Sequence, residues 1–449
     1  MNRLKLRKIL RATAWGVTGA VLLSLAVLTY VLGPALYHHF YLFPRQREAT
    51  RQLQAQRRDI PPPPGWKELV AACHVHSDLS HDSDGRWEDI LRQARSAGVD
   101  VVLMADHFRD RKADFSLQWA GVHGGVRFFR GFEMRNGFMP WGLPESTVLN
   151  ADEEPDRLAR SIGELGGLLF FAHIEEPRRW ELPQLTGLEI YNIHAAFKKR
   201  KLSRLVPDII LNGNAYPDQT LHLIFERPSE NLLKWDHLSR DRRLAGIAGN
   251  DVHQNSGLQG FYTDRDSLKL NTTGPREVLG EWRLNSLTRF LLRLFHGPLQ
   301  TTRPLFRYEA DRYEPMMRFV NTHVWVRDEA ETSILESLRS GRALIAFNHL
   351  ASARGFQFRA ESQGPGGLEH AVMGEQSPWR PGSRLLVESP LPCRFTLIRD
   401  GRVVRQQEGS SWVTGAEEPG KYRLEAELRY MGEWVPWVYS NPITLSTAQ

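Results

Sequence analysis

Cysteine is scarce in this chain of 449 residues, which contains only Cys73 and Cys393. Two cysteines exclude a disulfide-rich scaffold and a zinc site built from thiolates. The sequence has no internal repeat with a period of about 20–50 residues, which excludes a solenoid or a propeller. Apolar residues make up 41% and charged residues 24% of the chain, which is ordinary globular composition and excludes a wholly disordered protein.

Charge of one sign does not dominate either. Lysine and arginine number 58 against 52 aspartates and glutamates, so the formal net charge is +6 over the whole chain. Basic residues do not form a stripe interleaved with aromatic side chains, which is the pattern typical of nucleic-acid binding. We therefore do not expect nucleic acid as a partner.

The N-terminal segment has a basic head followed by a long uncharged stretch, residues 12–44. Its apolar part, residues 15–32, would span roughly 27 Å as a helix, close to the thickness of the hydrocarbon layer. A cleaved signal peptide is the alternative, but no small-residue cleavage site follows the run. We predict a single-pass helix in the inner (cell) membrane with the remaining chain outside the cytoplasm. Arginines on both sides of the span reduce the charge difference that sets this orientation.

The remaining chain divides into a stalk, a large α/β region and a small all-β region. Residues 45–65 form a polar segment that ends in a run of prolines, typical of a stiff spacer. After it, short apolar runs alternate with helical patterns and predict parallel β/α units. The expected strands are residues 101–104, 126–129, 168–172, 188–191 and 244–248, with helices at 86–97 and 152–165 between some of them.

Two later segments depart from this rhythm. Residues 256–320 fit it poorly, and within them residues 286–295 form an apolar, basic stretch. This stretch predicts an amphipathic helix that either packs on the body of the protein or lies on the membrane surface. After residues 329–340, a helix, and 343–347, a strand, the segment 381–449 carries only short strands with turn residues between them. It predicts a small β-sandwich.

Histidine and acidic residues recur where the apolar strands end. Pairs with a spacing of two residues follow the first and the last strand, and single residues or an Asp-His pair follow the strands between them. The residues are His74, His76, Asp106, His107, Glu133, His173, His194, Asp251 and His253. Parallel strands place these ends at one edge, where such folds carry their chemistry. Imidazoles and carboxylates gathered there without thiolates predict two to three divalent ions, namely zinc, manganese or iron.

The order HxH…D…DH…E…H…H…DxH resembles the PHP family, named for polymerase and histidinol phosphatase. The resemblance implies a distorted (β/α)7 barrel over residues 66–380, with residues 256–320 as an insertion, and up to three metal ions. It implies as metal ligands His74, His76, Asp82, His107, Glu133, His173, His194, Asp251 and His253. Glu133 would bridge the ions, and Asp84 or His81 would be the alternative to Asp82. Parts of the chain outside the motifs also resemble membrane-anchored or exported PHP metallohydrolases of the carbaryl-hydrolase-like group.

The expected activity is hydrolysis of a phosphate ester, either a small molecule or a compound linked to the cell envelope, by hydroxide generated at the metals. Asp251 or His194 would assist proton transfer, while Arg109, Arg135 and residues 198–200 would grip the phosphate. Two alternatives remain. A carbamate or carboxylic ester hydrolase would use the same metals, and a non-catalytic envelope protein would bind partners through the sandwich.

Overall fold

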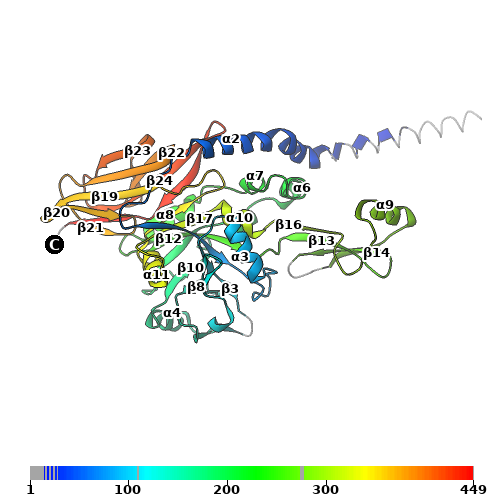
Figure 1. The fold of residues 1–449 in the computed structure, drawn as a ribbon, viewed down its shortest axis with the longest axis horizontal. Coiled ribbons are helices and arrows are strands. Elements are labelled where there is room, and N and C mark those ends of the chain that lie inside the picture. The colour runs from blue at the N-terminus through cyan, green and yellow to red at the C-terminus, as the bar shows by residue number, and fades with distance from the viewer. Residues whose placement is uncertain are drawn as a thin grey trace, which may run out of the picture.

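The structure is a computed structural model that describes residues 29–108, 111–273 and 278–447, together with isolated positions between 15 and 27. The predicted membrane helix, residues 15–32, is described only in part, because seven of its 18 residues lie outside the described residues. Among those that are described, no helix combines the length and the apolar character needed to cross a membrane. The chain has a mixed α/β fold with a large sheet (Figure 1).

The strands at the centre of the molecule are parallel and buried, as the apolar runs predict. Their order of pairing is β6 (Val126–Phe129), β2 (Val101–Met104), β1 (Lys67–Val75), β12 (Ala245–Val252), β11 (Gly187–Asn192) and β10 (Leu168–Phe171). Strand β8 (Phe138–Trp141) pairs with β10 in the antiparallel sense. Within the described chain, the end of β6 is linked to β8 by one isolated bridge, Gly131 with Trp141. A closed barrel therefore stays a prediction.

Helices connect and cover these strands. Two of them coincide closely with the sequence prediction, namely α3 (Trp87–Ser96) and α4 (Pro155–Glu164). Helix α4 begins where Glu154 accepts hydrogen bonds from the first backbone N–H groups and proline fills the first position, an arrangement that favours initiation. The other helices of this region are α5 (Ile193–Lys198), α6 (Leu202–Asn212), α7 (Pro217–His222), α8 (Ser229–Leu238), α10 (Tyr313–Phe319) and α11 (Glu331–Ser340).

Short elements complete the region between β2 and β10. They are β3 (Asp106–His107), β4 (Lys112–Asp114), η2 (Phe115–Leu117), β5 (Gly121–His123), β7 (Phe132–Glu133) and β9 (Val148–Asn150). Strand β3 pairs in parallel with β7, which sets His107 opposite Glu133. Two chemically important residues thereby become neighbours although they are far apart in the sequence.

The segment predicted as a stalk lies against the body of the protein. Its first part, from residue 45, belongs to α2 (Phe43–Gln56), which directly follows η1 (His38–Leu42), and the side chain of Phe43 at the start of α2 is fully buried. Nδ1 of His38 donates to Asp208 of α6 over 2.9 Å, and beyond the helix Arg57 donates to the carbonyl of Arg354 over 2.6 Å. These contacts hold the segment on the body of the protein, which its polar composition did not reveal.

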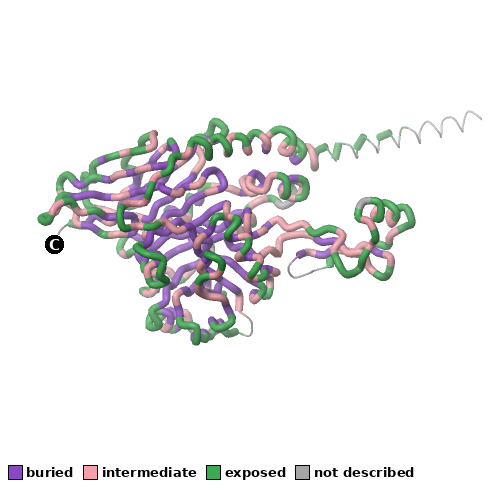
Figure 2. The backbone as a smooth tube through the Cα atoms, viewed as in Figure 1, coloured by how far each residue is buried: buried purple, intermediate pink, exposed green. Residues whose placement is uncertain are grey.

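The insertion forms a subdomain of its own. Strands β13 (Gly257–Tyr262), β14 (Ser267–Thr272), β15 (Val278–Arg283) and β16 (Phe306–Glu309) form an antiparallel sheet in the order β15-β14-β13-β16. Helix α9 (Ser286–His296) forms as predicted, and the subdomain projects from the body at the end of the molecule toward which the N-terminal helix also points (Figure 1). Most of α9 is exposed (Figure 2), so packing on the body is not observed.

The C-terminal strands enclose a second apolar core. They are β19 (Gln357–Gly364), β20 (Gly367–Val372), β21 (Gln376–Trp379), β22 (Arg384–Arg399), β23 (Arg402–Gly415), β24 (Gly420–Tyr430), β25 (Glu433–Ser440) and β26 (Ile443–Thr447). Because β19 pairs with β22, this region begins before residue 381, the boundary expected from the sequence. It is joined to the central strands through β17 (Asn321–Val326) and β18 (Ala343–Ala346), which pairs with β25.

Candidate metal centre

The predicted strand ends meet at one place. His76 directly follows β1, His107 ends β3, Glu133 ends β7, His173 follows β10 and Asp251 lies near the end of β12. The side chains of His74 and His76 are fully buried, and those of Glu133, Asp251 and His253 are nearly so. Burial of so many polar groups is costly unless each finds a partner.

Strained backbone carries three of these residues. His74, His173 and Asp251 have positive φ angles of 62°, 49° and 49°. Residues other than glycine rarely adopt this left-handed conformation, and it persists where the surrounding structure imposes it, often at functional sites. The register of β1 against both β2 and β12 shifts at His74. This bulge, rather than regular strand alternation, brings the rings of His74 and His76 to a centroid distance of 5.0 Å.

The carboxylate of Glu133 lies in the middle of the cluster. Its Oε2 atom is 3.2 Å from Nε2 of His74, 3.8 Å from Nε2 of His76 and 3.6 Å from Nε2 of His107. Its Oε1 atom is 3.3 Å from Nε2 of His173. One carboxylate thus faces four imidazoles, which is the environment that a bridging ligand requires.

Asp251 faces three of the same imidazoles. Its Oδ1 atom is 3.4 Å from Nε2 of His74 and 3.5 Å from Nε2 of His76, and its Oδ2 atom is 3.3 Å from Nε2 of His173. The ligand atoms of His74, His76, Glu133 and Asp251 all lie within 4.8 Å of one another. They form one buried group that could hold a metal ion.

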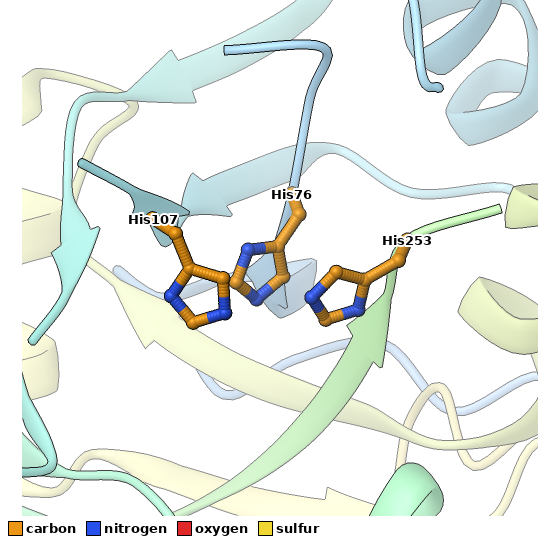
Figure 3. A group of neighbouring side chains, drawn as sticks. All are labelled: His76, His107 and His253. Carbon is orange, nitrogen blue, oxygen red and sulfur yellow. The ribbon is translucent and has the colours of Figure 1, made fainter. Parts of the chain in front are cut away.

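A second group adjoins the first. Oδ2 of Asp82 is 3.6 Å from Nε2 of His107 and 3.6 Å from Nε2 of His253. Figure 3 shows the rings of His76, His107 and His253 side by side, and their ligand atoms also lie within 4.8 Å of one another. The rings of His76 and His253 stack at 3.7 Å. Since His76 belongs to both groups, the two positions are contiguous.

The spacing of these atoms fits metal coordination better than hydrogen bonding. Hydrogen bonds between nitrogen and oxygen are typically about 2.7–3.2 Å long, whereas two ligand atoms at about 2.1 Å from one tetrahedral ion lie roughly 3.4 Å apart. Nε2 of His76, Nε2 of His253 and Oδ1 of Asp82 are buried and have no hydrogen-bond partner among the described residues. Buried polar atoms of this kind need an ion or a water molecule, and this donor set fits a divalent cation.

The electrostatics of the cluster attract cations. Burial disfavours protonation of His74, but the carboxylates of Asp251, Glu189 and Glu133 outweigh burial and hold the pKa of His74 well above its ordinary value. Burial also opposes ionisation of Asp251, yet the neighbouring His74 and His173 hold its pKa well below the usual range. Without a metal ion, protonated imidazole therefore balances the charge of the carboxylates, which stay ionised. A divalent cation would supply the same balance and compete with those protons.

Glu189 is an important residue of this site that the sequence does not reveal. It lies within the wholly buried strand β11, where Nδ1 of His74 donates to its Oε1 atom over 2.6 Å and the backbone N–H of His173 donates to its Oε2 atom over 2.9 Å. A Cβ atom on Gly249 would come within 1.6 Å of Oε1, so glycine is required for this placement. Asn192 donates to both Glu189 and Asp251, over 2.9 and 3.1 Å. The sequence signal that could have identified Glu189 is its charge within a largely apolar strand.

Asp106 has a supporting role. Its carboxylate accepts hydrogen bonds from the backbone of Ser77, from the hydroxyls of Ser77 and Ser80, and from the side-chain amide of Gln118. The hydroxyl of Ser80 in turn lies 3.1 Å from Nδ1 of His76 and accepts the backbone N–H of His107 over 2.9 Å. Asp106 therefore fixes the loop that carries the candidate ligands.

The remaining predicted residues lie at the margin of the cluster or away from it. His194, on α5, is half-buried with its ring 6.0 Å from that of His253, and burial lowers its pKa. Of the three alternatives in the first motif, Asp82 faces the imidazoles, the carboxylate of Asp84 lies 3.7 Å from Arg307, and His81 is exposed. Arg135 is exposed just beyond Glu133. Arg109 lies outside the described residues.

Comparison with known proteins adds a likeness to solved structures. No protein-family model matches the chain, and no curated protein matches it. Among solved structures, the chain resembles a two-domain protein containing a predicted PHP-like metal-dependent phosphoesterase from Bacteroides vulgatus, with 13% sequence identity over 86% of this chain and 98% of that chain. The TM-score is 0.34. At this level the likeness establishes neither fold nor activity, so the function has to follow from the chemistry of the site.

Proposed function

We propose that this protein is a metal-dependent phosphoesterase of the PHP type. The proposal depends on one observation: buried imidazoles and carboxylates face one another at the separations of co-ligands, and the Nε2 atoms of His76 and His253 have no hydrogen-bond partner among the described residues. A set of nitrogen and oxygen ligands without thiolate suits zinc, manganese or iron. Two to three ions per chain would satisfy the cluster.

Each part of the cluster has a distinct task in this proposal. His74, His173, Asp251 and Glu133 would hold ions on one side, and Asp82, His107 and His253 on the other, with His76 shared between the two sides. When bound, divalent ions supply Lewis acidity toward phosphoryl oxygens and lower the pKa of a water molecule to about 7. Glu189 holds Nδ1 of His74, which leaves Nε2 of that ring directed at Glu133.

Proton transfer falls to His194 rather than Asp251. Both oxygens of Asp251 already face imidazoles, and Oδ2 also accepts from Asn192. His194 stands at the edge of the cluster, half-buried, where an imidazole nitrogen can give a proton to a departing alkoxide. Binding of the substrate phosphate by Arg109 and Arg135 stays a prediction.

Competing substrates provide the test. Protein purified without chelator is analysed for bound metal, then loaded with Mn²⁺ or Zn²⁺ and assayed with p-nitrophenyl phosphate and with p-nitrophenyl acetate. We expect bound transition metal and preference for the phosphate. Preference for the acetate would favour a carbamate or carboxylic ester hydrolase. Absence of bound metal together with no turnover of either compound would favour a non-catalytic envelope protein.

We also propose that the protein acts at a membrane, as a single-pass inner-membrane protein with its catalytic region outside the cytoplasm. Support comes from α9, where Leu287, Phe290 and Leu294 recur at helical spacing on one face and are 67%, 61% and 67% exposed. Trp282 beside them is also exposed, and Arg293 lies on the same helix. Exposed apolar and aromatic side chains with arginines suit the interface of an anionic lipid bilayer.

A label at this helix tests the membrane proposal. Full-length Phe290→Cys, carrying a fluorophore, is reconstituted into anionic vesicles that contain a spin-labelled lipid. We expect strong quenching at position 290 and none with the label at Leu117→Cys, an exposed position on η2. Equal quenching at the two positions would contradict the proposal.

A further inference from the structure

A largely apolar pocket opens beside the candidate metal centre. The space between its walls is about 630 Å³ when the open mouth is included. Helices α5, α6 and α7 and the start of α10 form its walls. The apolar side chains that line it include Ile193, Phe197, Leu205, Ile209, Ile224 and Met316.

The polar end of the pocket adjoins the cluster. His194 lines the pocket and lies beside His253, with ring centroids 6.0 Å apart. Asp311 lines it as well, and its carboxylate accepts the backbone N–H groups of Asn255 and Ser256, two and three residues after His253. The side chain of Asn255 donates to the carbonyl of Asp82 over 2.6 Å. The wall of the pocket and the loops of the metal cluster are thus hydrogen-bonded to each other.

The insertion supplies part of this wall. Tyr308 of β16 and Arg312, which precedes α10, both line the pocket. The hydroxyl of Tyr308 fills the space where a Cβ atom of Gly213 would lie, and Arg312 donates to the carbonyl of Gly213 over 3.2 Å. Contacts across the pocket therefore fix its shape before a ligand arrives, which limits the entropy lost on binding.

We infer that this pocket holds the apolar part of the substrate, so that the substrate is a phosphate ester of an aryl or alkyl alcohol. This inference rests on the proposed phosphoesterase activity and names its substrate class. A phosphate group at the cluster and an apolar substituent in the pocket match the polar and apolar ends of this continuous site. A sugar or another polyol would leave its hydroxyl groups without partners against these side chains, which is costly.

The reaction balances as hydrolysis. The oxygen of one water molecule forms a bond to phosphorus, and the bond between phosphorus and the ester oxygen breaks. The departing alkoxide takes a proton, for which His194 at the entrance of the pocket is the nearest candidate donor. The products are inorganic phosphate and an apolar alcohol, which remains in the pocket until it dissociates.

A homologous series of substrates tests the inference. The full-length protein loaded with Mn²⁺ is assayed with methyl, butyl, hexyl and octyl phosphate. Burial of each methylene group contributes about fourfold to kcat/KM, so we expect a steep rise along the series until the pocket is filled. Binding of octylphosphonate, which is not hydrolysed, is measured by calorimetry and should show tighter binding than methylphosphonate and a negative change in heat capacity.

Neighbouring residues on α6 provide a matched pair of variants. Ile209 lines the pocket, whereas Ile210 is 55% exposed. Ile209→Trp should reduce kcat/KM for octyl phosphate at least tenfold and leave methyl phosphate within about twofold. Ile210→Trp should change neither. If Ile209→Trp does not fold, Ile209→Phe fills less of the pocket and should show the same trend to a smaller extent.

The outcomes separate the two proposals. No hydrolysis of any member of the series, with metal bound, would overturn the proposed phosphoesterase activity. Hydrolysis at equal efficiency across the series would overturn the apolar pocket alone. A rise with chain length that persists in Ile209→Trp and in Ile209→Phe would also overturn it, because the chain would then bind elsewhere.

Discussion

Two groups of buried charged side chains differ in how completely their members are paired. At the contact of α8 with β24, Arg423 donates two hydrogen bonds of 2.6 Å to the carboxylate of Asp236 and one of 2.7 Å to Glu425. Glu425 also pairs with Arg227. At the candidate metal centre the carboxylates and imidazoles lie mostly 3.3–3.8 Å apart, and buried ring nitrogens have no hydrogen-bond partner among the described residues.

The difference separates structural from functional burial. In the group around Arg423 each charge meets an opposite charge at hydrogen-bond distance, so nothing further needs to bind. In the metal centre the imidazole nitrogens and carboxylate oxygens point toward one another, mostly at distances longer than hydrogen bonds. Three of these residues also have unusual positive φ angles. Burial of charge alone would have identified both regions as candidate binding sites. Incomplete pairing of the buried polar atoms identifies only the metal centre.

The largest expected effect follows removal of a ligand at the candidate metal centre. His76→Ala and Asp251→Asn should each lower kcat/KM for the preferred phosphate ester at least a thousandfold, because a metal ion contributes several kcal/mol to the transition state. The fold should persist, which circular dichroism checks, since these residues lie at strand ends. His123→Ala, on β5 and away from the cluster, serves as the control and should keep full activity. Activity within tenfold of the original in either cluster variant would contradict the assignment.

At the group around Arg423 the expected effect is on the free energy of unfolding. Arg423→Met leaves Asp236 and Glu425 buried without their common partner, which should lower the free energy of unfolding by about 3 kcal/mol. The folded fraction should retain its activity and its metal content. Urea denaturation followed by tryptophan fluorescence measures the change, and Arg402→Met, at an exposed arginine, should change stability by less than about 0.5 kcal/mol. A loss of metal from Arg423→Met would mean that the two groups are coupled.

The sequence predicts many residues of the candidate metal centre because each follows a short apolar run that is visible in the local sequence. Strands β2 and β6 have the predicted bounds, since short apolar runs flanked by polar residues mark buried parallel strands. The polar residue after each run then identifies a strand end. Asp82 is the alternative of the first motif whose carboxylate faces the imidazoles of His107 and His253.

Long-range contacts explain what the sequence did not predict. Glu189 matters because His74, 115 residues away, meets it across the fold, and no local pattern encodes that distance. The C-terminal region begins at β19 because β19 pairs with β22, again through non-local hydrogen bonds. The β13–β16 sheet has weak alternation and depends on antiparallel partners that its sequence does not name.

The smallest effect, and the sharpest test of the comparison, concerns two glutamates that share two kinds of contact. Glu189 binds Nδ1 of His74 at 2.6 Å and a backbone N–H at 2.9 Å. Glu68 binds Nδ1 of His323 at 2.6 Å and the backbone N–H of Gly355 at 2.8 Å, yet neither Glu68 nor His323 belongs to the groups suited to a metal ion. Glu189 also accepts a hydrogen bond from Asn192. The main difference between the two pairs is the partner of the other ring nitrogen, which is Glu133 for His74 and the side chain of Asn348 for His323.

Glu189→Gln should weaken binding of Zn²⁺ or Mn²⁺ by about 10–100-fold, because a carboxylate that orients a ligand histidine also raises its basicity. Glu68→Gln should cost similar stability and leave metal affinity unchanged. Calorimetric titration of metal-depleted protein measures the affinities, and thermal melting measures the stabilities. Equal loss of affinity in both variants would show that a general loosening of the fold is responsible. A loss confined to Glu189→Gln would show that the carboxylate acts through His74, since the neutral amide keeps the shape of the side chain and removes its charge.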